Sequence, residues 1–473
     1  MSHDNLGFTS STEAVDVKPL PPTGKDYPRS KIFVAEVEEK KNYLKDPEQP
    51  YEPYENRDVQ HPTTNSETLL HLLKGSLGTG ILAMPKAFAN AGYVVGLIGT
   101  VVIGLLCTYC IHLLIKAQYE LCRRKKVPSL SYPATAEAAL SEGPKILRRF
   151  SKSAVHVVNI FLLIYQLGAC CVYVVFIAQN LKSALDSFVT PIDERLYMLA
   201  LLLPLILINW VRNLKYLAPF STIANAITLV SFGIILYYIF RVPPSLEKCD
   251  PIGKVENFPL FFGTVLFALE AIGVIMPLEN EMKTPRSFGK SCGVLNIGMS
   301  TIILLYVGMG FFGYMRYGNG VKGSITLSLS DDEIPAKVVQ ILLALAIYVT
   351  HALQCYVAVD ICWNDYLGHK FKSNSHKLFW EYFVRTCLVL VTFLLAVAIP
   401  ELELFISLFG ALCLSALGLA FPAIIQSCTF WNVIQGNEKI LMLAKNTSLV
   451  LFGILGLIVG TYTSLRDIIT TFS

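Results

Sequence analysis

The chain of 473 residues is 53% hydrophobic and only 16% charged, and its mean hydropathy is +0.52. A soluble enzyme of this length needs a more polar surface, so the composition excludes that class and predicts a membrane protein with several spans. The net charge of +4 says little by itself, because the distribution of Lys and Arg carries the information on orientation. Most of the 12 cysteines lie in apolar runs, where Cys acts as a small hydrophobe, and we expect no disulfide between loops.

Residues 1–66 differ from the rest of the chain, because they hold eight prolines and many charges. Such a composition cannot bury enough apolar surface to fold, so we expect a mostly disordered cytosolic tail. The tail has no apolar run long enough for a signal peptide, and the first spanning helix is therefore expected to direct insertion.

Apolar runs of about 20 residues predict eleven spanning helices. They are expected at 67–90, 92–118, 153–180, 196–213, 216–241, 258–281, 291–316, 335–361, 378–400, 402–428 and 443–465. We divide them into a first repeat of five helices (67–241), a second repeat of five (258–428) and one extra helix (443–465). Because five is odd, the second repeat enters from the opposite side, and the expected fold is all-α with inverted 5+5 repeats.

The basic residues predict the orientation. With a cytosolic N-terminus, the cytosolic loops hold nineteen Lys and Arg residues and the opposite side holds nine. The positive-inside rule therefore places the N-terminus in the cytosol and the C-terminus outside the cell or in an organelle lumen.

Three glycines in six residues interrupt the first predicted span, in the sequence GSLGTG at 75–80. Glycine costs about 1 kcal/mol in a helix interior relative to alanine, so this cluster indicates a break in the helix. In lipid, a break is tolerated only where its unpaired backbone groups line a cavity or are buried in protein. We take all six residues as candidates for substrate binding: Gly75, Ser76, Leu77, Gly78, Thr79 and Gly80.

The sixth predicted span is interrupted as well, by Glu270, Gly273 and Pro277. It occupies the position in the second repeat that the first span occupies in the first repeat. Paired interrupted helices at matching positions point to the binding site of a secondary transporter. Glycine patterns also serve helix packing, and we assign that role to Gly289-xxx-Gly293 and Gly456-xxx-Gly460.

The two breaks suit the two charged ends of an amino acid. The N–H groups that open the second half of the first span carry the positive end of a helix dipole and favour a carboxylate. The break near Glu270 and Gly273 offers carbonyls and an acid, which suit an ammonium group. Phe267, Ile272 and Tyr306 are expected to limit the room for the substrate side chain.

His71 lies one turn before the first break and could couple proton and substrate movement, since histidine titrates at mildly acidic pH. A neutral structural histidine is an equally good reading from the spacing alone. We expect Glu270 to be a proton site, an ammonium ligand or a gate partner, with a purely structural role as the alternative. No metal-ligand cluster, nucleotide loop or nucleophile–base arrangement occurs in the sequence, so we expect neither an enzyme nor an ATP-driven pump, with no metal, no nucleic-acid partner and no cofactor besides the coupling proton.

The segment from His71 to Pro85, HLLKGSLGTGILAMP, closely resembles the first-helix signature of the proton-coupled amino acid transporters, solute carrier family 36 in the amino acid/auxin permease group. The segment FALEAIG at 267–273, followed by PLENEM at 277–282, is similar to the sixth-helix signature of that family. The resemblance covers roughly residues 65–470. It implies a leucine-transporter-like fold and sodium-independent symport of small neutral amino acids with protons, with the proton-linked histidine at His71. Mammalian members use a cysteine pair in their outer loops, whereas Cys249 stands nearly alone here.

The resemblance places the protein in the plasma membrane or the lysosomal membrane, and some family members feed nutrient signalling. Two alternatives stay open. The chain could be an amino acid sensor that signals through its tail to a cytosolic partner with little flux, or a proton-independent exchanger.

Overall fold

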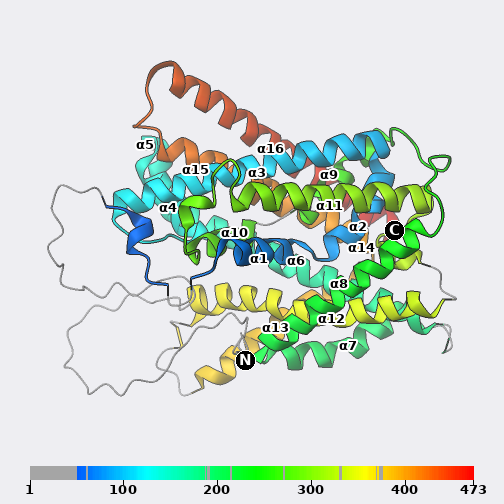
Figure 1. Cartoon of the computed structure of the whole chain (residues 1–473). Helices are drawn as coiled ribbons and strands as arrows, with labels where there is room; N and C mark the ends of the chain where they lie inside the picture. Colours follow the sequence, from blue (N-terminus) through cyan, green and yellow to red (C-terminus); the bar gives the residue numbers. More distant parts are fainter. Residues whose placement is uncertain are drawn as a thin grey trace, which may run out of the picture.

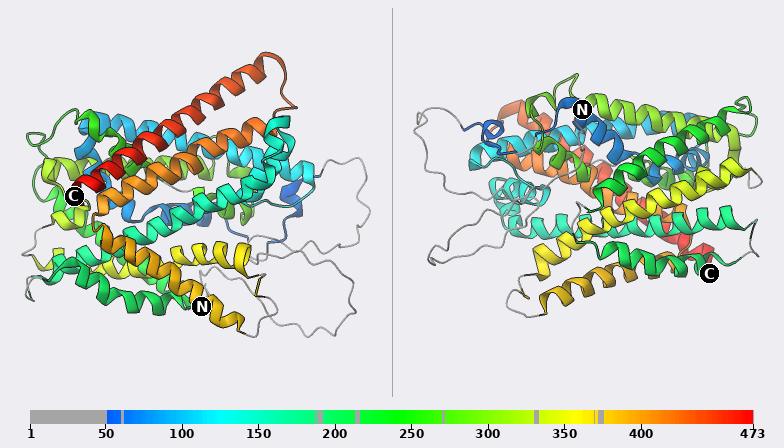
Figure 2. Two further views of the ribbon diagram at one scale, coloured as in Figure 1. Left: turned by 180° about the vertical axis from the view of Figure 1, so that it is seen from behind. Right: turned by 60° about the horizontal axis from the view of Figure 1, so that its bottom comes forward.

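The computed structural model describes residues 51–59, 62–186, 188, 192–212, 216–269, 272–329, 333–368, 370–371 and 376–472. These residues form helices and connecting segments, with one isolated parallel bridge between Thr63 and Met282. The long helices run side by side along one direction of the molecule (Figures 1 and 2). An all-α fold is therefore confirmed for the described part of the chain.

Eight helices of the described part are long and apolar enough to cross a membrane. They are α3 (Tyr93–Lys125), α6 (Ser151–Leu185), α8 (Ala218–Phe240), α11 (Val294–Tyr317), α12 (Ile334–Asp360), α13 (Lys377–Ala398), the continuous run of α14 (Leu402–Phe409), η8 (Gly410–Ala420) and α15 (Phe421–Thr429), and α16 (Gly436–Phe472). Each lies where the sequence predicts a spanning helix. A further apolar helix, α7 (Glu194–Asn209), has 16 residues. The count of eleven spans and the repeat symmetry stay predictions.

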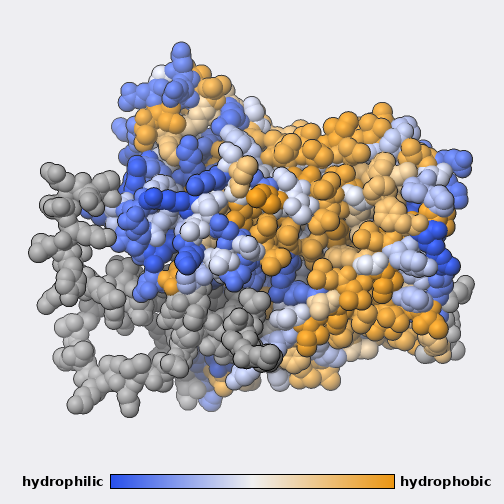
Figure 3. Space-filling view, in the orientation of Figure 1, coloured by the Kyte–Doolittle hydropathy of each residue, from blue (hydrophilic) through white to orange (hydrophobic). Residues whose placement is uncertain are grey.

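The outer surface of these helices is apolar. Figure 3 shows a broad hydrophobic band across the middle of the molecule, with hydrophilic residues towards both ends. Large side chains are exposed on the outer helices, such as Leu229 on α8 (65% exposed), Leu394 on α13 (62%) and Leu451 on α16 (62%). Water-soluble monomers rarely expose apolar surface on this scale, so the band faces lipid and the chain is an integral membrane protein with several crossings.

The first and sixth apolar runs are each divided into two short helices, as the sequence predicts. The first consists of α1 (Asn65–Ser76) and α2 (Thr79–Ala91), and the sixth of α9 (Phe258–Ala268) and α10 (Ile272–Asn280). Helix α2 packs against α9 and α11, and α9 packs against α14 and η8. Helices α2 and α9 thus lie inside the bundle, packed against each other and against their neighbours.

The connections contain short helices that the sequence analysis treated as loops. Ser131 caps α4 (Tyr132–Glu142) by accepting from Ala134 N, and the Tyr132 hydroxyl donates to Leu417 O at 2.6 Å. The other short elements are α5 (Lys145–Arg148), a π-helix η7 (Ile361–Leu367), and the 3₁₀ turns η1 (Pro53–Asn56), η3 (Val255–Asn257), η4 (Pro285–Ser287), η5 (Gly318–Gly320) and η6 (Ile325–Ser328).

Residues 1–50 of the expected tail lie outside the described residues. The end of that segment, residues 51–59 and 62–66, packs on the helices: η1 contacts α3, and Thr63 N donates to Glu281 O at 2.9 Å. The chain therefore joins the helical body before the first apolar run begins.

Glycines allow α9 and η8, a π-helix, to approach one another closely. A Cβ atom on Gly410 would lie 1.9 Å from Gly263 O, and one on Gly263 would lie 2.3 Å from Ser407 O. The second predicted packing pattern is confirmed, since Gly456 and Gly460 would meet Phe262 at 2.3 Å and Ala411 at 2.5 Å. The first is wrong, because Gly289 and Gly293 lie in the connection between α10 and α11 and not in a helix.

We predict that Gly410→Ala destabilises the protein, because its methyl group would collide with backbone that cannot move aside; overpacking of this kind costs about 1–3 kcal/mol or more. Gly418→Ala, in the same π-helix, is the matched control, since a Cβ there meets nothing within 4 Å. The melting temperature of the purified protein in detergent measures the difference. Equal melting temperatures for the two variants would contradict the assigned contact.

Candidate functional site

The first break lies at Leu77 and Gly78, between α1 and α2. Leu77 N donates to Leu73 O at 3.0 Å and closes α1, and Gly78 N turns back to Ser76 O at 2.9 Å. Of the six candidate residues, Gly75 and Ser76 therefore end α1, Leu77 and Gly78 form the break, and Thr79 and Gly80 begin α2. The predicted interruption is thus confirmed, while the assignment of these residues to substrate binding stays a prediction.

The start of α2 has features of an anion site. Its N-cap residue is Gly78, and no side chain caps the helix within the described structure. The Thr79 hydroxyl is buried and has no hydrogen-bond partner among the described residues. The first N–H groups of a helix lack partners within it and carry the positive end of its dipole. Uncapped N–H groups beside an unpaired hydroxyl form a donor set suited to a carboxylate.

The second break separates Ala268, the last residue of α9, from Ile272, the first residue of α10. Leu269 closes α9 by donating its N–H to Val265 O at 2.9 Å. Glu270, the predicted ammonium or proton site, lies outside the described residues. Gly273 lies in the first turn of α10 and is exposed. The interruption is confirmed, and the role of Glu270 stays a prediction.

The two breaks touch one another through Gly80. A Cβ atom on Gly80 would lie 2.6 Å from Ala268 Cα, closer than side chains approach backbone. Only glycine at this position lets the first turn of α2 lie directly against the last turn of α9. The sequence analysis counted Gly80 as a ligand-binding residue, and the structure gives it this packing role.

Tyr306 of α11 holds the end of α1. Its side chain is fully buried, and its hydroxyl donates to Ser76 O, one of the carbonyls that the break leaves without a helical partner. The sequence analysis placed Tyr306 in the wall of the substrate pocket, and in the structure it satisfies the backbone at the break. The Ser76 hydroxyl donates to Leu72 O at 3.1 Å within α1.

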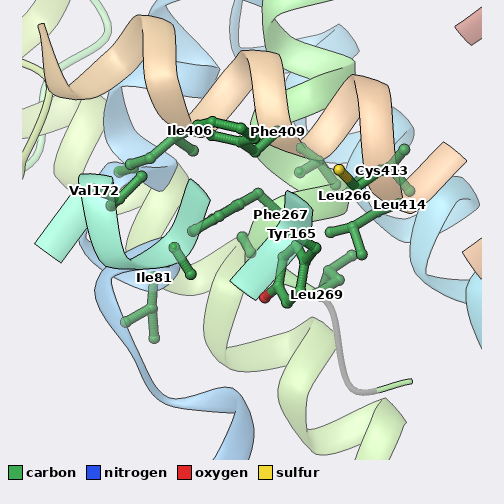
Figure 4. Packing of buried hydrophobic residues seen from close by; sticks show 14 of the residues in the cluster. Ile81, Tyr165, Val172, Leu266, Phe267, Leu269, Ile406, Phe409, Cys413 and Leu414 are labelled. Atoms are coloured by element: carbon green, nitrogen blue, oxygen red, sulfur yellow. The ribbon is translucent and has the colours of Figure 1, made fainter. Parts of the chain in front are cut away.

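Phe267 lies at the end of α9 in a layer of buried apolar side chains (Figure 4). It is 7% exposed, and its ring centroid lies 6.0 Å from that of Tyr165 on α6. Phe409 of α14 lies in the same layer, next to Ile406. This aromatic layer borders the second break, and the role of Phe267 in substrate binding stays a prediction.

His71 lies on α1 between Glu67 and Lys74, nearly two turns before the break at Leu77. It is half-buried, whereas Lys74 and Gly75 are exposed. The neighbouring Leu72 packs on α11, where a Cβ on Gly298 would come within 2.5 Å of it. The structure therefore places His71 near the first break, and its role in proton coupling stays a prediction.

Comparison with known proteins decides the family. Residues 61–466 match the family model described as transmembrane amino acid transporter protein. The chain belongs to this family of amino acid transporters. It is 41% identical over 424 residues to the "Proton-coupled amino acid transporter-like protein pathetic" of Drosophila melanogaster, covering 89% of each chain. It is 27% identical over 432 residues to the "Probable amino acid transporter skat-1" of Caenorhabditis elegans, covering 89% of this chain and 93% of the relative.

The amino acid transporter also has two ion pairs that the sequence analysis missed. Lys86 Nζ on α2 lies 3.5 Å from Glu403 Oε2 on α14, and Asn90 Nδ2 donates to Glu403 Oε1 at 2.7 Å. A lysine inside an apolar run is costly in a membrane, and this signal could have identified Lys86. The second pair, Arg57 with Glu279, joins the segment before α1 to the end of α10. Arg57 lies in a polar stretch where no local signal distinguishes it.

We predict that Tyr306→Phe loosens the end of α1, because the Ser76 carbonyl then accepts from Gly78 N alone and loses one of its two hydrogen bonds, at a cost of about 0.5–1.5 kcal/mol. Hydrogen exchange measured by mass spectrometry over residues 65–80 should become faster. Tyr314→Phe is the control on the same helix, since the Tyr314 hydroxyl accepts from Asp250 N and donates to Asn319 Oδ1. Unchanged exchange over α1 in Tyr306→Phe would show that this hydrogen bond does not hold the break.

Proposed function

We propose that the protein is a proton-coupled symporter of small neutral amino acids, with the amino acid held between the breaks of the first and sixth spans. The contact of Gly80 with Ala268 carries this proposal, because it sets the start of α2 beside the end of α9. One helix offers free N–H groups and the other free C=O groups at the same place. These are the complements of an α-carboxylate and an α-ammonium.

The carboxylate would be bound at the start of α2. Its ligands would be the N–H groups there, the Thr79 hydroxyl and the backbone from Gly75 to Gly80. The ammonium would be bound by the last carbonyls of α9, together with Glu270 and the first turn of α10 at Gly273. A ligand that contacts both breaks stabilises one arrangement of the four short helices. Binding therefore shifts the protein towards that conformation.

The aromatic layer at the second break supports a small, uncharged substrate side chain. Phe267 and Tyr165 lie in ring contact and are both almost fully buried. Apolar rings offer no partner for a charged side chain, and leaving such a charge without one is costly. The layer therefore favours substrates of the size of glycine, alanine or proline.

His71 is the residue that we propose couples protons to transport. It lies nearly two turns before the first break, and histidine changes charge between the pH of the cytosol and that of an acidic compartment. The printed name of the Drosophila relative, which describes a proton-coupled transporter-like protein, supports the same coupling.

We further propose eleven spans in inverted 5+5 repeats with a cytosolic N-terminus and an extracellular or lumenal C-terminus, in the plasma membrane, the lysosomal membrane or both. Helix α7 and the two divided helices supply the three spans beyond the eight long helices. The tail at 1–66 would be the segment that reaches a cytosolic signalling partner.

The test is electrical recording in oocytes that express the full chain, with glycine, alanine or proline added at acidic and at neutral pH in sodium-free medium. We predict an inward current that grows at acidic pH and is lost in His71→Ala. His156→Ala is the control, since His156 is exposed on α6 and its Nδ1 lies 3.0 Å from the Tyr366 hydroxyl. Surface expression is measured for both variants.

Other outcomes would select the alternatives. Uptake without current or acid stimulation would indicate a proton-independent exchanger. Binding with neither uptake nor current, together with output lost on deletion of residues 1–50, would indicate a sensor.

A further inference from the structure

The segment before α1, described at residues 51–59 and 62–64, lies along the end of α10 and the connection that follows it. Thr63 N donates to Glu281 O, and Lys283 N donates to Thr63 O, both at 2.9 Å. At the start of α1, Asn65 Oδ1 accepts from the hydroxyls of Thr284 and Ser287, also at 2.9 Å. We call residues 51–59 and 62–64 the strap.

The strap is fixed by a buried ion pair. The Arg57 guanidinium donates to both Oε2 and the backbone O of Glu279 at 2.9 Å, and its Nε donates to Pro128 O at 3.1 Å. The Arg57 side chain is 7% exposed and the Glu279 side chain 1%. One residue of the strap therefore joins the end of α10 to the segment that follows α3.

Aromatic rings and a second charged group surround this pair. Arg57 lies 4.7 Å from the centre of the Tyr54 ring, which packs 4.8 Å from the Tyr119 ring of α3. The Tyr119 hydroxyl donates to Glu52 at 2.9 Å, and Arg286 of η4 lies 3.2 Å from the same carboxylate. Burial and the neighbouring Glu279 carboxylate raise the pKa of the Tyr54 hydroxyl, so Tyr54 stays neutral.

The strap ties together the two helix halves that have a break at their other end. Helix α1 follows directly from it and ends at the break at Leu77, whereas α10 begins just after the second break. At the other end of the first divided helix, Lys86 of α2 pairs with Glu403 of α14. The strap therefore holds α1 beside α10, and a transporter must separate elements of this kind to admit or discharge its substrate.

We propose that the strap is a cytosolic latch: the Arg57–Glu279 pair holds α1 and α10 closed, and it separates each time the site opens to the cytosol. The proposal rests on the proposed function and orientation. A charge pair suits this role, because the attraction between two buried ions is nearly balanced by the cost of removing them from water. When the site opens to the cytosol, water hydrates both ions again. The pair therefore defines the closed arrangement of the helices and can still separate.

A native cysteine reports on the latch. Cys122 lies one turn after Tyr119 on α3, on the face that the strap covers, and it is 1% exposed. Its thiol lies within electrostatic range of both Arg57 and Glu279. Cys170 and Cys171 on α6 are buried too, at 0% exposed, and serve as internal references for unfolding.

The experiment labels the full chain in inside-out membrane vesicles with a membrane-impermeant maleimide and identifies the modified cysteines by mass spectrometry. The exposed Cys292 is replaced by serine. We expect Arg57→Gln to raise the labelling rate of Cys122 about tenfold or more, because Glu279 is left buried without its partner. The change of charge alone would act in the opposite direction, since a cation beside a thiol favours the reactive thiolate.

Two further variants complete the test. The exchange of charges, Arg57→Glu with Glu279→Arg, should bring the labelling rate back towards that of the wild type. Arg241→Gln removes an exposed ion pair with Glu333 and should leave the labelling rate of Cys122 unchanged. Labelling of Cys122 at the wild-type rate in Arg57→Gln, or parallel labelling of Cys170 and Cys171, would overturn the latch.

A latch must also open during transport. Addition of a transported amino acid should therefore change the rate at which wild-type Cys122 is labelled. Uptake with no such change would mean a static tie, which overturns the latch and leaves the proposed function intact. If the amino acid is not taken up and the labelling rate of Cys122 does not change, both the latch and the proposed function are overturned.

Discussion

At Gly80 the backbone of α2 meets the backbone of α9, and a single methyl group there would lie 2.6 Å from Ala268 Cα. This contact matters because a helix in lipid has to satisfy its backbone groups internally, and this chain departs from that rule at two places. By setting the two interruptions against each other inside the bundle, it gathers free N–H and C=O groups in one region. Tyr306 donates to the Ser76 carbonyl at the first break, and the Thr79 hydroxyl has no partner among the described residues.

The remaining charges of the bundle lie where partners meet them. Glu381 and Arg385 of α13 form the pair that their spacing suggests, at 3.2 Å, and Arg212 joins the same carboxylate at 2.8 Å. Lys86 ties α2 to α14, and Arg57 ties the segment before α1 to the end of α10. These pairs, together with the glycine contacts of α9, help to fix how the divided helices pack.

Much of this architecture follows from local sequence. Apolar runs are long enough to identify the helices, and the glycines at 75–80 mark the first break because glycine lowers helix stability wherever it occurs. The second break lies before Ile272, so that Pro277 is inside α10 and does not cause it. The strap could not be predicted, because Arg57 and Glu279 are 222 residues apart in the sequence and lie in segments of ordinary polar composition. The role of Gly80 depends on Ala268 in the same way, and only the three-dimensional structure shows it.

The account depends on a substrate carboxylate at the start of α2, and the binding of alanine to purified protein tests this most directly. In Thr79→Val, the loss of a hydrogen bond to a charged group should weaken binding by about tenfold or more. Thr100→Val of α3 removes another buried hydroxyl without a partner among the described residues, and it should bind alanine like the wild type. Equal binding by Thr79→Val and the wild type would contradict the account.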